Sequence, residues 1–278
     1  MQITMTEEAT ATPQSHACDC HFHVFRAHES SGGARYVPAY TSTLDDWANA
    51  ARPLGVTRGV VVQPSFSGTD NTVLLGALAA RSDTLRGVAV VAPDASVTEL
   101  KALHAAGVRG VRLNFASVGD DTAKLREISP RWWPALIEAE LHLELHTDAG
   151  RAAALLPLIP REITVVLDHF AKPKDISARD ETLRAVRDRN SAGTATFVTL
   201  SGAYRQSVEN ALRCAEITSL WRNEIGVARL LWGSDWPCTN HEHAANYAAL
   251  FEALNAWLPS TADRRAVLSD NPDSLYWR

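Results

Sequence analysis

Residues 141–146 read Leu-His-Leu-Glu-Leu-His, an unbroken alternation of apolar and polar side chains. Successive side chains of an extended chain point to opposite faces, so a strict period of two predicts a β-strand. One face of this strand carries three leucines, and the other carries His142, Glu144 and His146. We expect the leucines to pack against helices and the polar face to lie inside a closed sheet, with His146 at the carboxyl end of the strand.

Similar short runs recur along the chain and alternate with longer amphipathic stretches. The predicted strands are 18–24, 58–63, 85–91, 108–114, 141–146, 163–169, 196–201 and 229–235. Helices are predicted between them, for example at 44–53, 71–81, 97–106, 131–140, 151–158 and 207–221. Eight such units in 278 residues indicate an α/β fold of the (β/α)8 TIM barrel type. An open doubly wound sheet is the alternative, but the Gly-rich phosphate loop expected after its first strand is absent from the sequence.

The chain is expected to form a single domain, because it contains no low-complexity linker and no obvious internal duplication. We assign residues 1–16 to a flexible N-terminal tail and residues 17–278 to the barrel. The first 15 residues lack the basic and apolar regions of a signal peptide, and no apolar run approaches the roughly 18 residues of a membrane helix. The sequence therefore predicts a cytoplasmic protein without a membrane partner.

The charged residues, 27 basic against 32 acidic, give a net charge of −5. Nucleic-acid binding needs a clustered basic surface, so this balance argues against a nucleic-acid partner. The four cysteines, Cys18, Cys20, Cys214 and Cys238, are too few and too scattered for a disulfide framework, and none has a zinc-knuckle spacing. We expect buried free thiols. Whether the chain forms a homo-oligomer stays open.

The first predicted strand contains the pair His21-x-His23. Residues two apart on a strand face the same way, here into the barrel, and two imidazoles at that spacing can share one divalent ion. By itself the pair is weak evidence for a metal site. A second His-x-His, His241 and His243, lies on the loop after the last strand, where a helical turn is the simpler interpretation.

Three further strands end in a polar side chain that can bind a metal or transfer a proton. These are His146 on the fifth strand, His169 on the sixth and Asp235 on the eighth. Strict alternation predicts that Val165, Leu167 and His169 share one inward face, and that Leu231, Gly233 and Asp235 share another. The carboxyl ends of the strands form the face where barrel enzymes place their chemistry, so we expect one shared site there.

In chain order, His-x-His on the first strand, His on the fifth, His on the sixth and Asp on the eighth resemble the ligand set of the amidohydrolase superfamily. Six segments resemble the branch of 2-pyrone-4,6-dicarboxylate lactonases, which also contains sugar lactonases and a sulfomuconolactonase. They are Asp-Cys-His-Phe-His-Val-Phe (19–25), Val-Gln-Pro-Ser-x-x-Gly-Thr-Asp-Asn (62–71), Gly-Val-Arg-Leu-Asn (110–114), Asp-His-x-x-Lys-Pro (168–173), Ser-Gly-Ala-Tyr-Arg (201–205) and Trp-Gly-Ser-Asp-Trp-Pro (232–237). The similarity extends from about residue 17 to the C-terminus.

The resemblance implies a hydrolase that opens a lactone by metal-assisted attack of water. His21, His23, His146 and Asp235 would bind one divalent cation, Zn²⁺ or Mn²⁺, with an open position for water. Asp235 would also accept a proton from that water, and His169 would polarise the substrate carbonyl. The inward residues of the fourth strand are Arg112 and Asn114 rather than a bridging ligand, so a single cation is expected.

Three cations lie at or just past the carboxyl ends of strands, namely Arg112, Lys172 and Arg205. They predict a carboxylated lactone as substrate, because charge-assisted hydrogen bonds orient such groups. Tyr36 and Ser65 would add hydrogen bonds. Pyrone-dicarboxylate enzymes carry a further arginine where this chain has Val118, so the particular lactone (a carboxylated pyrone, a muconolactone or a sugar lactone) stays open.

Other functions also fit the sequence. Some lactonases of this branch work without a metal and lack the histidine on strand five, so metal-free catalysis stays open although His146 favours a metal. A metal-dependent decarboxylase of the same superfamily could reuse the same ligands on a carboxylated substrate. A metal-dependent nuclease fits poorly with the acidic charge balance. The alternative that is not an enzyme is a barrel that binds a ligand without turnover.

Overall fold

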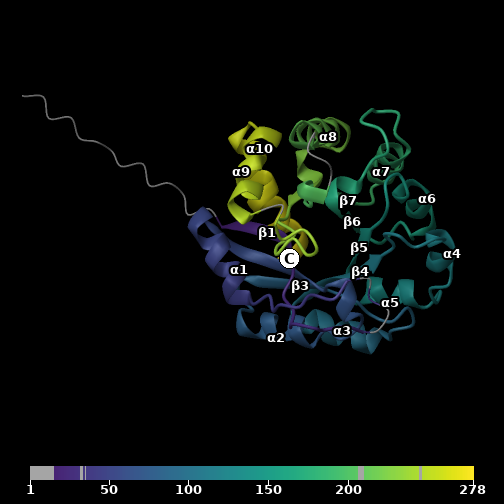
Figure 1. Ribbon diagram of the computed structural model, residues 1–278. Helices are drawn as coiled ribbons and strands as arrows, with labels where there is room; N and C mark the ends of the chain where they lie inside the picture. Colours follow the sequence, from purple (N-terminus) through teal and green to yellow (C-terminus); the bar gives the residue numbers. More distant parts are fainter. Residues whose placement is uncertain (1–15, 32–33, 35, 206–209, 244–245) are drawn as a thin grey trace, which may run out of the picture.

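A computed structural model describes residues 16–31, 34, 36–205, 210–243 and 246–278, so most of the predicted N-terminal tail lies outside the described residues. Within them, parallel strands form one eight-stranded sheet in the order of the sequence. The strands are β1 (Ala17–Phe22), β2 (Val56–Val62), β3 (Leu85–Ala89), β4 (Val108–Asn114), β5 (His142–His146), β6 (Val165–Leu167), β7 (Thr196–Leu200) and β8 (Leu230–Trp232). The predicted (β/α)8 barrel is confirmed (Figure 1).

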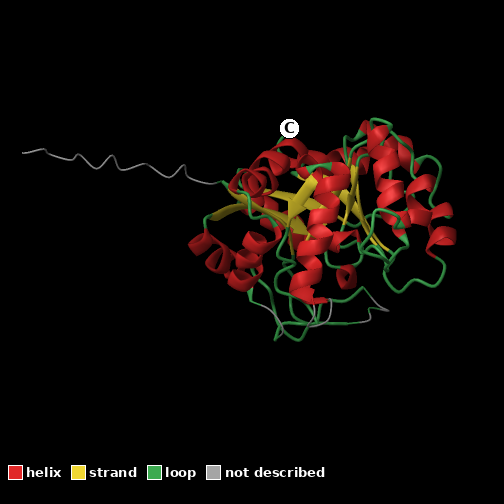
Figure 2. Cartoon of the chain, turned by 90° about the horizontal axis from the view of Figure 1, so that it is seen from above, coloured by secondary structure: helices red, strands yellow, loops and turns green. Residues whose placement is uncertain are grey.

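Helices follow the strands and surround them (Figures 1 and 2). They are α1 (Leu44–Ala51), α2 (Thr72–Ala80), α3 (Val97–Ala105), α4 (Asp121–Arg126), α5 (Trp132–Glu138), α6 (Ala152–Leu155), α7 (Glu181–Ser191), α8 (Asn210–Ile225), α9 (Tyr247–Trp257), α10 (Thr261–Arg265) and α11 (Asn271–Tyr276). A π-helical turn, η7 (Ala266–Asp270), joins α10 to α11. The start of the predicted helix at 207–221 falls partly outside the described residues. Along the described chain, no helix is both long enough and apolar enough to cross a membrane.

The barrel closes between β1 and the segment that follows β8. Phe22 forms an isolated parallel bridge with Trp236. The backbone N–H of Asp235 donates to the carbonyl of His21 at 2.8 Å, and the N–H of His23 donates to the carbonyl of Trp236 at 2.8 Å. The segment that carries Asp235 is therefore held directly beside the segment that carries the two histidines of β1.

Two sets of buried apolar side chains occupy the two faces of the strands. The larger set joins strands to helices and includes Leu143 and Leu145 of β5, as the alternation predicts. The smaller set fills the inside of the barrel and is closed at the amino end of the strands by α11. Its members are Cys18, Cys20, Val60, Val62, Val88, Val166, Phe197, Leu231, Leu275 and Tyr276. All four cysteines are buried and free, as expected.

Strand β1 breaks the strict alternation. Cys20 packs inside the barrel, yet His21 and His23 also face the interior. The pairing of β1 with β2 shifts register between Asp19 and Phe22, so two consecutive residues can point inward. As a result Asp19 and Phe22 both face the helix layer, where both contact Trp47 of α1.

The predicted phase of β6 was wrong. Val165 and Leu167 pack with the helices, and Val166 lies inside the barrel. Asp168, in phase with Val166, therefore faces the interior. His169 reaches the site because the strand ends before it and the backbone turns at a positive φ of 52°. The error arose because the prediction extended the period of two past the true end of the strand.

Candidate active site

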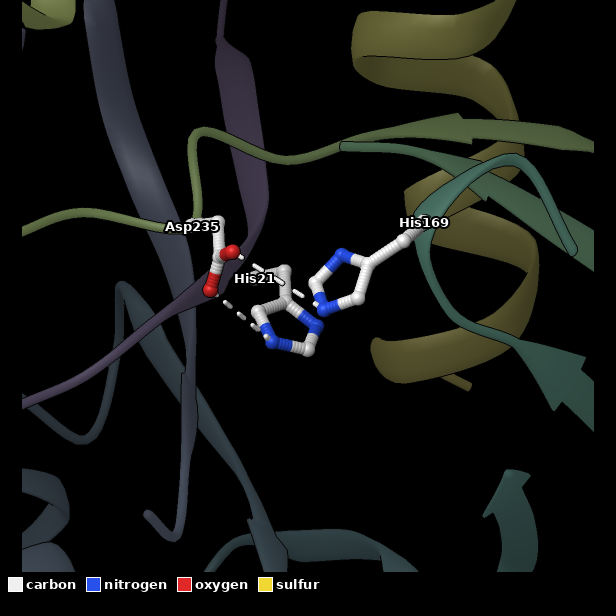
Figure 3. A group of neighbouring side chains, drawn as sticks. All are labelled: His21, His169 and Asp235. Atoms are coloured by element: carbon white, nitrogen blue, oxygen red, sulfur yellow. Dashed lines mark ion pairs between the residues drawn. The ribbon is translucent and has the colours of Figure 1, made fainter. Parts of the chain in front are cut away.

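Five side chains that the sequence placed at strand ends gather at the carboxyl end of the barrel, which we call the C-terminal mouth. His23 Nε2 lies 3.2 Å from Asp235 Oδ1, and His21 Nε2 lies 3.7 Å from the same oxygen. His169 Nε2 lies 3.8 Å from Asp235 Oδ2 (Figure 3). The rings of His146 and His169 meet edge to face at 4.6 Å. Asp235, 1 % exposed, is the centre of the group.

Two other residues bind the second oxygen of Asp235. The Tyr204 hydroxyl donates to Oδ2 at 2.6 Å, and Arg205 Nε donates to it at 2.7 Å. Burial alone would raise the pKa of Asp235, but the Arg205 guanidinium and the neighbouring histidines hold it well below its usual range. The carboxylate is therefore ionised at neutral pH, and its Oδ1 faces the histidines of β1.

His169 begins a left-handed turn that runs through Lys172, with positive φ at every residue. The turn brings the His169 ring against Ser201, with Nδ1 2.9 Å from Oγ. Burial holds the pKa of His169 well below its usual value, so the ring is neutral. If the Ser201 hydroxyl donates to Nδ1, the ring proton lies on Nε2, the nitrogen that faces Asp235.

The same turn places Lys172 over His146. Lys172 Nζ lies 2.8 Å from His146 Nε2, and burial holds the pKa of His146 well below its usual value. The neutral ring accepts a hydrogen bond from the ammonium group at this nitrogen. Among the described residues no carboxylate lies within 4 Å of Lys172 Nζ. Burial and the nearby Arg205 guanidinium both lower the pKa of Lys172, which shows that two cations share this side of the mouth.

Beneath these residues lies a buried network of charges. Arg112 donates to Asp168 Oδ2 from Nε at 3.1 Å and from the terminal nitrogen at 2.8 Å, and its Nε is 3.2 Å from Glu144 Oε1. His21 Nδ1 lies 3.5 Å from Glu144 and 3.4 Å from Asp168. Burial opposes a charge on His21, yet these carboxylates raise its pKa to about 9. Burial and Asp168 raise the pKa of Glu144 to about 8.

Two predicted substrate-binding residues lie outside this cluster. Ser65 is exposed in the turn after β2. The Tyr36 hydroxyl donates to Glu242 Oε1 at 3.1 Å, and Tyr40 donates to the same oxygen at 2.7 Å. Tyr36 therefore joins the loop after β1 to the loop after β8. On that second loop, the ring of His241 lies 5.5 Å from the ring of Tyr204.

Donor atoms at the C-terminal mouth can hold a divalent cation. His23 Nδ1 lies 2.7 Å from the carbonyl of Val62, which can only accept, so the ring proton is on Nδ1 and a lone pair of Nε2 faces the ionised Asp235. Both ring nitrogens of His21 are buried without a hydrogen-bond partner among the described residues, and a cation at Nε2 would replace the proton that the neighbouring carboxylates favour on this ring. Ligands about 2.1 Å from a tetrahedral ion lie about 3.4 Å apart, and Asp235 Oδ1 lies 3.2 and 3.7 Å from the two histidines of β1. Within the described part of the chain, the donor atoms around Asp235 that all lie within 4.8 Å of one another belong to His21, His169 and Asp235. His146 differs, because its Nε2 faces Lys172.

Sequence reasoning missed several members of the site. Tyr204 and Asp168 stand next to assigned residues in the quoted segments but received no role, and Glu144 was predicted to face inward without one. Ser201 was quoted only as part of a segment. The signal for Asp168 and Glu144 was their inward phase between two predicted ligands. No local pattern predicts these contacts, because the Ser201 contact depends on the turn after β6 and the Tyr204 contact depends on the turns after β7 and β8.

Comparisons with known proteins agree with this geometry. The family model described as "Amidohydrolase" matches residues 18–278. The chain is 30% identical to the 2-pyrone-4,6-dicarboxylate hydrolase of Comamonas testosteroni, over 94% of this chain and 90% of that one. It is 28% identical to the 4-sulfomuconolactone hydrolase of Hydrogenophaga intermedia, over 93% and 88% of the two chains.

Among solved structures, one from Acinetobacter baumannii described as a probable 2-pyrone-4,6-dicarboxylic acid hydrolase, with citric acid bound, superposes with a TM-score of 0.82. The two sequences are 30% identical, and the match covers 94% of this chain and 99% of that one. The chain is therefore an enzyme of the amidohydrolase family, in the branch of the 2-pyrone-4,6-dicarboxylate hydrolases and their relatives.

Proposed function

We propose that this enzyme hydrolyses a small lactone that carries at least one carboxylate. The observation that carries the proposal is the position of Asp235, a buried and ionised carboxylate between the imidazoles of His21, His23 and His169. Such a group can accept a proton from water beside the neutral ring of His169, which can polarise a carbonyl. The names of the relatives, which are hydrolases of lactones, support the same reaction class.

The cations at the mouth support a carboxylated substrate. Lys172 has no carboxylate partner among the residues described, and Arg205 donates to Asp235 through Nε. Two adjacent cations repel each other unless an anion lies between them. We assign Lys172 and Arg205 as the groups that bind the substrate carboxylate. Arg112 is instead paired with Asp168 and Glu144 and serves to hold the buried network.

Hydrolysis would proceed in two steps. Water attacks the lactone carbonyl carbon while Asp235 accepts one of its protons, and His169 Nε2–H stabilises the oxyanion that forms. The ring C–O bond then breaks, and the leaving oxygen takes the proton back from Asp235. The net change is one water consumed and one hydroxy or keto acid formed. A substrate carboxylate that draws Arg205 away from Asp235 would also make Asp235 a stronger base.

The enzyme would hold a divalent cation, Zn²⁺ or Mn²⁺, through His21 and Asp235, with His23 and His146 as the further ligands that the sequence predicts. When bound, such a cation lowers the pKa of the attacking water and polarises the carbonyl oxygen. His146 can take that role only if its Nε2 exchanges the Lys172 ammonium for the cation, since the two compete for one lone pair. Lys172 would then be released toward the substrate carboxylate.

The test is acid release from a panel of lactones at constant pH. Carboxylated pyrones, muconolactones and sugar lactones are each compared with a neutral lactone of the same ring size, with and without added Zn²⁺ or Mn²⁺. We expect hydrolysis of at least one carboxylated lactone by the wild type, and hydrolysis slower by about 10²–10⁴ with Asp235→Asn. Consumption of a carboxylated substrate with release of CO₂ would instead favour the decarboxylase. Failure to consume any member of the panel would overturn the proposal.

A further inference from the structure

Asp19 is a fully buried carboxylate that lies outside the barrel, between β1 and the helix layer. It is two residues from His21, but the register shift in β1 turns it to the opposite face. Its oxygens accept hydrogen bonds from four separate parts of the chain. Trp47 Nε1 of α1 donates at 3.0 Å, the Tyr247 hydroxyl of α9 at 3.1 Å, and the backbone N–H of His21 at 3.2 Å.

The fourth part is the turn that follows β8. Ser234 donates its backbone N–H to Asp19 Oδ1 at 2.9 Å and its hydroxyl to Oδ2 at 2.6 Å. The same hydroxyl accepts from the N–H of Trp236 at 3.0 Å. Ser234 is thus bound at both its backbone and its side chain, and the bonds continue to the residue on the other side of Asp235.

The approach of this turn to β1 is very close. A Cβ atom on Gly233 would lie 2.5 Å from His21 Cβ and 2.9 Å from His21 N, so only glycine fits there. Asp235 itself adopts a φ of 59°, a left-handed conformation that costs free energy for a residue other than glycine. Such a conformation persists only when the surroundings impose it. The N–H of Asp235 is held by the carbonyl of His21, and the residue before it is held by the bonds that Ser234 donates to Asp19.

We propose that Asp19 is a positioning residue that fixes the Asp235 carboxylate against the histidines of β1. It acts through Ser234 and does not touch the reacting atoms. This inference rests on the proposed function only for its kinetic consequence, since the placement of Asp235 can be observed directly. A displacement of about 1 Å in a reacting group can cost about 10²-fold in rate, so even a small release of the turn is measurable.

The experiment compares variants that break different bonds of the same carboxylate. Asp19→Asn keeps the shape but turns an amide N–H₂ toward donors. Ser234→Ala removes only the hydroxyl that links Asp19 to Trp236. This second variant tests the same proposal if Asp19→Asn does not fold. Tyr247→Phe is the matched control, because it removes a donor to Asp19 from α9 and leaves the bonds to Ser234 intact. Crystal structures and steady-state kinetics are measured for all three and for the wild type.

We expect Asp19→Asn to lower kcat about 10- to 100-fold with KM changed by about threefold or less, and Ser234→Ala to lower kcat by a smaller factor. Tyr247→Phe should lower the melting temperature without changing kcat. In the crystals, Asp235 should move away from His23 in the first two variants and stay in Tyr247→Phe. If the wild type hydrolyses no lactone, the proposed function fails, and the crystal structures still decide this inference. An Asp235 that keeps its wild-type place in both Asp19→Asn and Ser234→Ala would overturn it.

Discussion

His146 and His142 lie four residues apart on the inward face of β5, and both are buried. His146 stands at the C-terminal mouth, where His169, Lys172 and Arg112 surround it. His142 stands at the other end of the barrel, against the ring of Tyr276, and we call that pair the N-terminal plug. Burial, with Arg278 nearby, lowers the pKa of His142 to about 3.

The difference between the two ends lies in the neighbours, since the residue type and the strand are the same. A Cβ on Gly110 would lie 2.3 Å from His142 Nε2, so the ring fills the space that a side chain would otherwise take. His142 has no carboxylate or second imidazole in contact, and its Nε2 has no hydrogen-bond partner among the described residues. An imidazole becomes chemically useful where the strand ends bring other charged groups to it. His142 fills space in the core of the barrel, whereas His146 lies in the candidate active site.

The largest expected effect is at the centre of the mouth. Asp235→Asn keeps the shape and one ligand oxygen but removes the proton acceptor, so kcat should fall by about 10²–10⁴. Steady-state kinetics on the best lactone measure it. Asp121→Asn is the matched control, because Asp121 is also a buried carboxylate paired with an arginine, Arg151, and should lose stability rather than turnover. Near-normal turnover in Asp235→Asn would show that the mouth works without its central carboxylate.

The next effect concerns His146 and the cation. His146→Ala removes one proposed imidazole ligand and leaves the base in place, so kcat should fall by about 10- to 100-fold and recover in part with excess Zn²⁺ or Mn²⁺. Asp235→Asn should not recover. Metal analysis of the purified proteins and assays after chelation are the measurements, with His104→Ala on the surface as control. A wild-type enzyme that stays fully active after chelation would show that catalysis does not need the cation.

The third expected effect concerns Lys172, which we assign to the substrate carboxylate. Lys172→Met should raise KM for a carboxylated lactone by about tenfold and leave KM for a neutral lactone nearly unchanged, because the ammonium group proposed to bind the substrate carboxylate is lost. Lys101→Met, which changes an exposed lysine of α3 paired with Glu138, is the control. Equal losses on both substrates would mean that Lys172 serves only to hold His146.

Arg112→Ala should instead lower the free energy of unfolding by about 3–5 kcal/mol, since it leaves two buried carboxylates without their cation.

The smallest expected effect on turnover is at the N-terminal plug. His142→Leu should leave kcat within about twofold, but it should change how stability depends on pH. The folded pKa of His142 is about 3 against 6.5 in the unfolded chain, so only the unfolded chain takes up the proton between these values. Stability is full above pH 6.5 and is lost as pH falls toward 3, by about 2 kcal/mol at pH 5.

Urea unfolding of wild type and His142→Leu at pH 7 and pH 5 measures this difference. The wild type should lose about 2 kcal/mol more than the variant on acidification. His243→Leu, at an exposed loop residue, should behave as the wild type does. A His142→Leu protein that matches the wild type at both pH values would mean that His142 does not remain neutral in the fold.

Much of this structure follows from the sequence, because alternation fixes which side chains of a strand face inward. The barrel, the inward face of β5 and the place of His146 at its carboxyl end come from that rule, whereas His169 and Asp235 reach the site through turns at positive φ. The rule fails where the chain leaves the strand. It missed the shift that turns both Cys20 and His21 inward, and it misplaced the face of β6, because neither follows a period of two.

Contacts that depend on left-handed turns could not be predicted either. Lys172 reaches His146 only through the turn that begins at His169, and Tyr204 reaches Asp235 only because Asp235 itself adopts a positive φ. No residue pattern in the sequence specifies these conformations. These turns determine where the ammonium group of Lys172 and the guanidinium group of Arg205 lie at the C-terminal mouth. They therefore decide which of the predicted substrate-binding residues can contact a substrate.

The most direct test of the central claim is hydrolysis of the best carboxylated lactone in H₂¹⁸O, followed by mass spectrometry of the product. We expect a ring-opened acid that carries one ¹⁸O in its new carboxylate, formed by the wild type and formed more slowly by about 10²–10⁴ with Asp235→Asn. A product without the label, or one that has lost CO₂, would contradict attack of water on the lactone carbonyl at the C-terminal mouth.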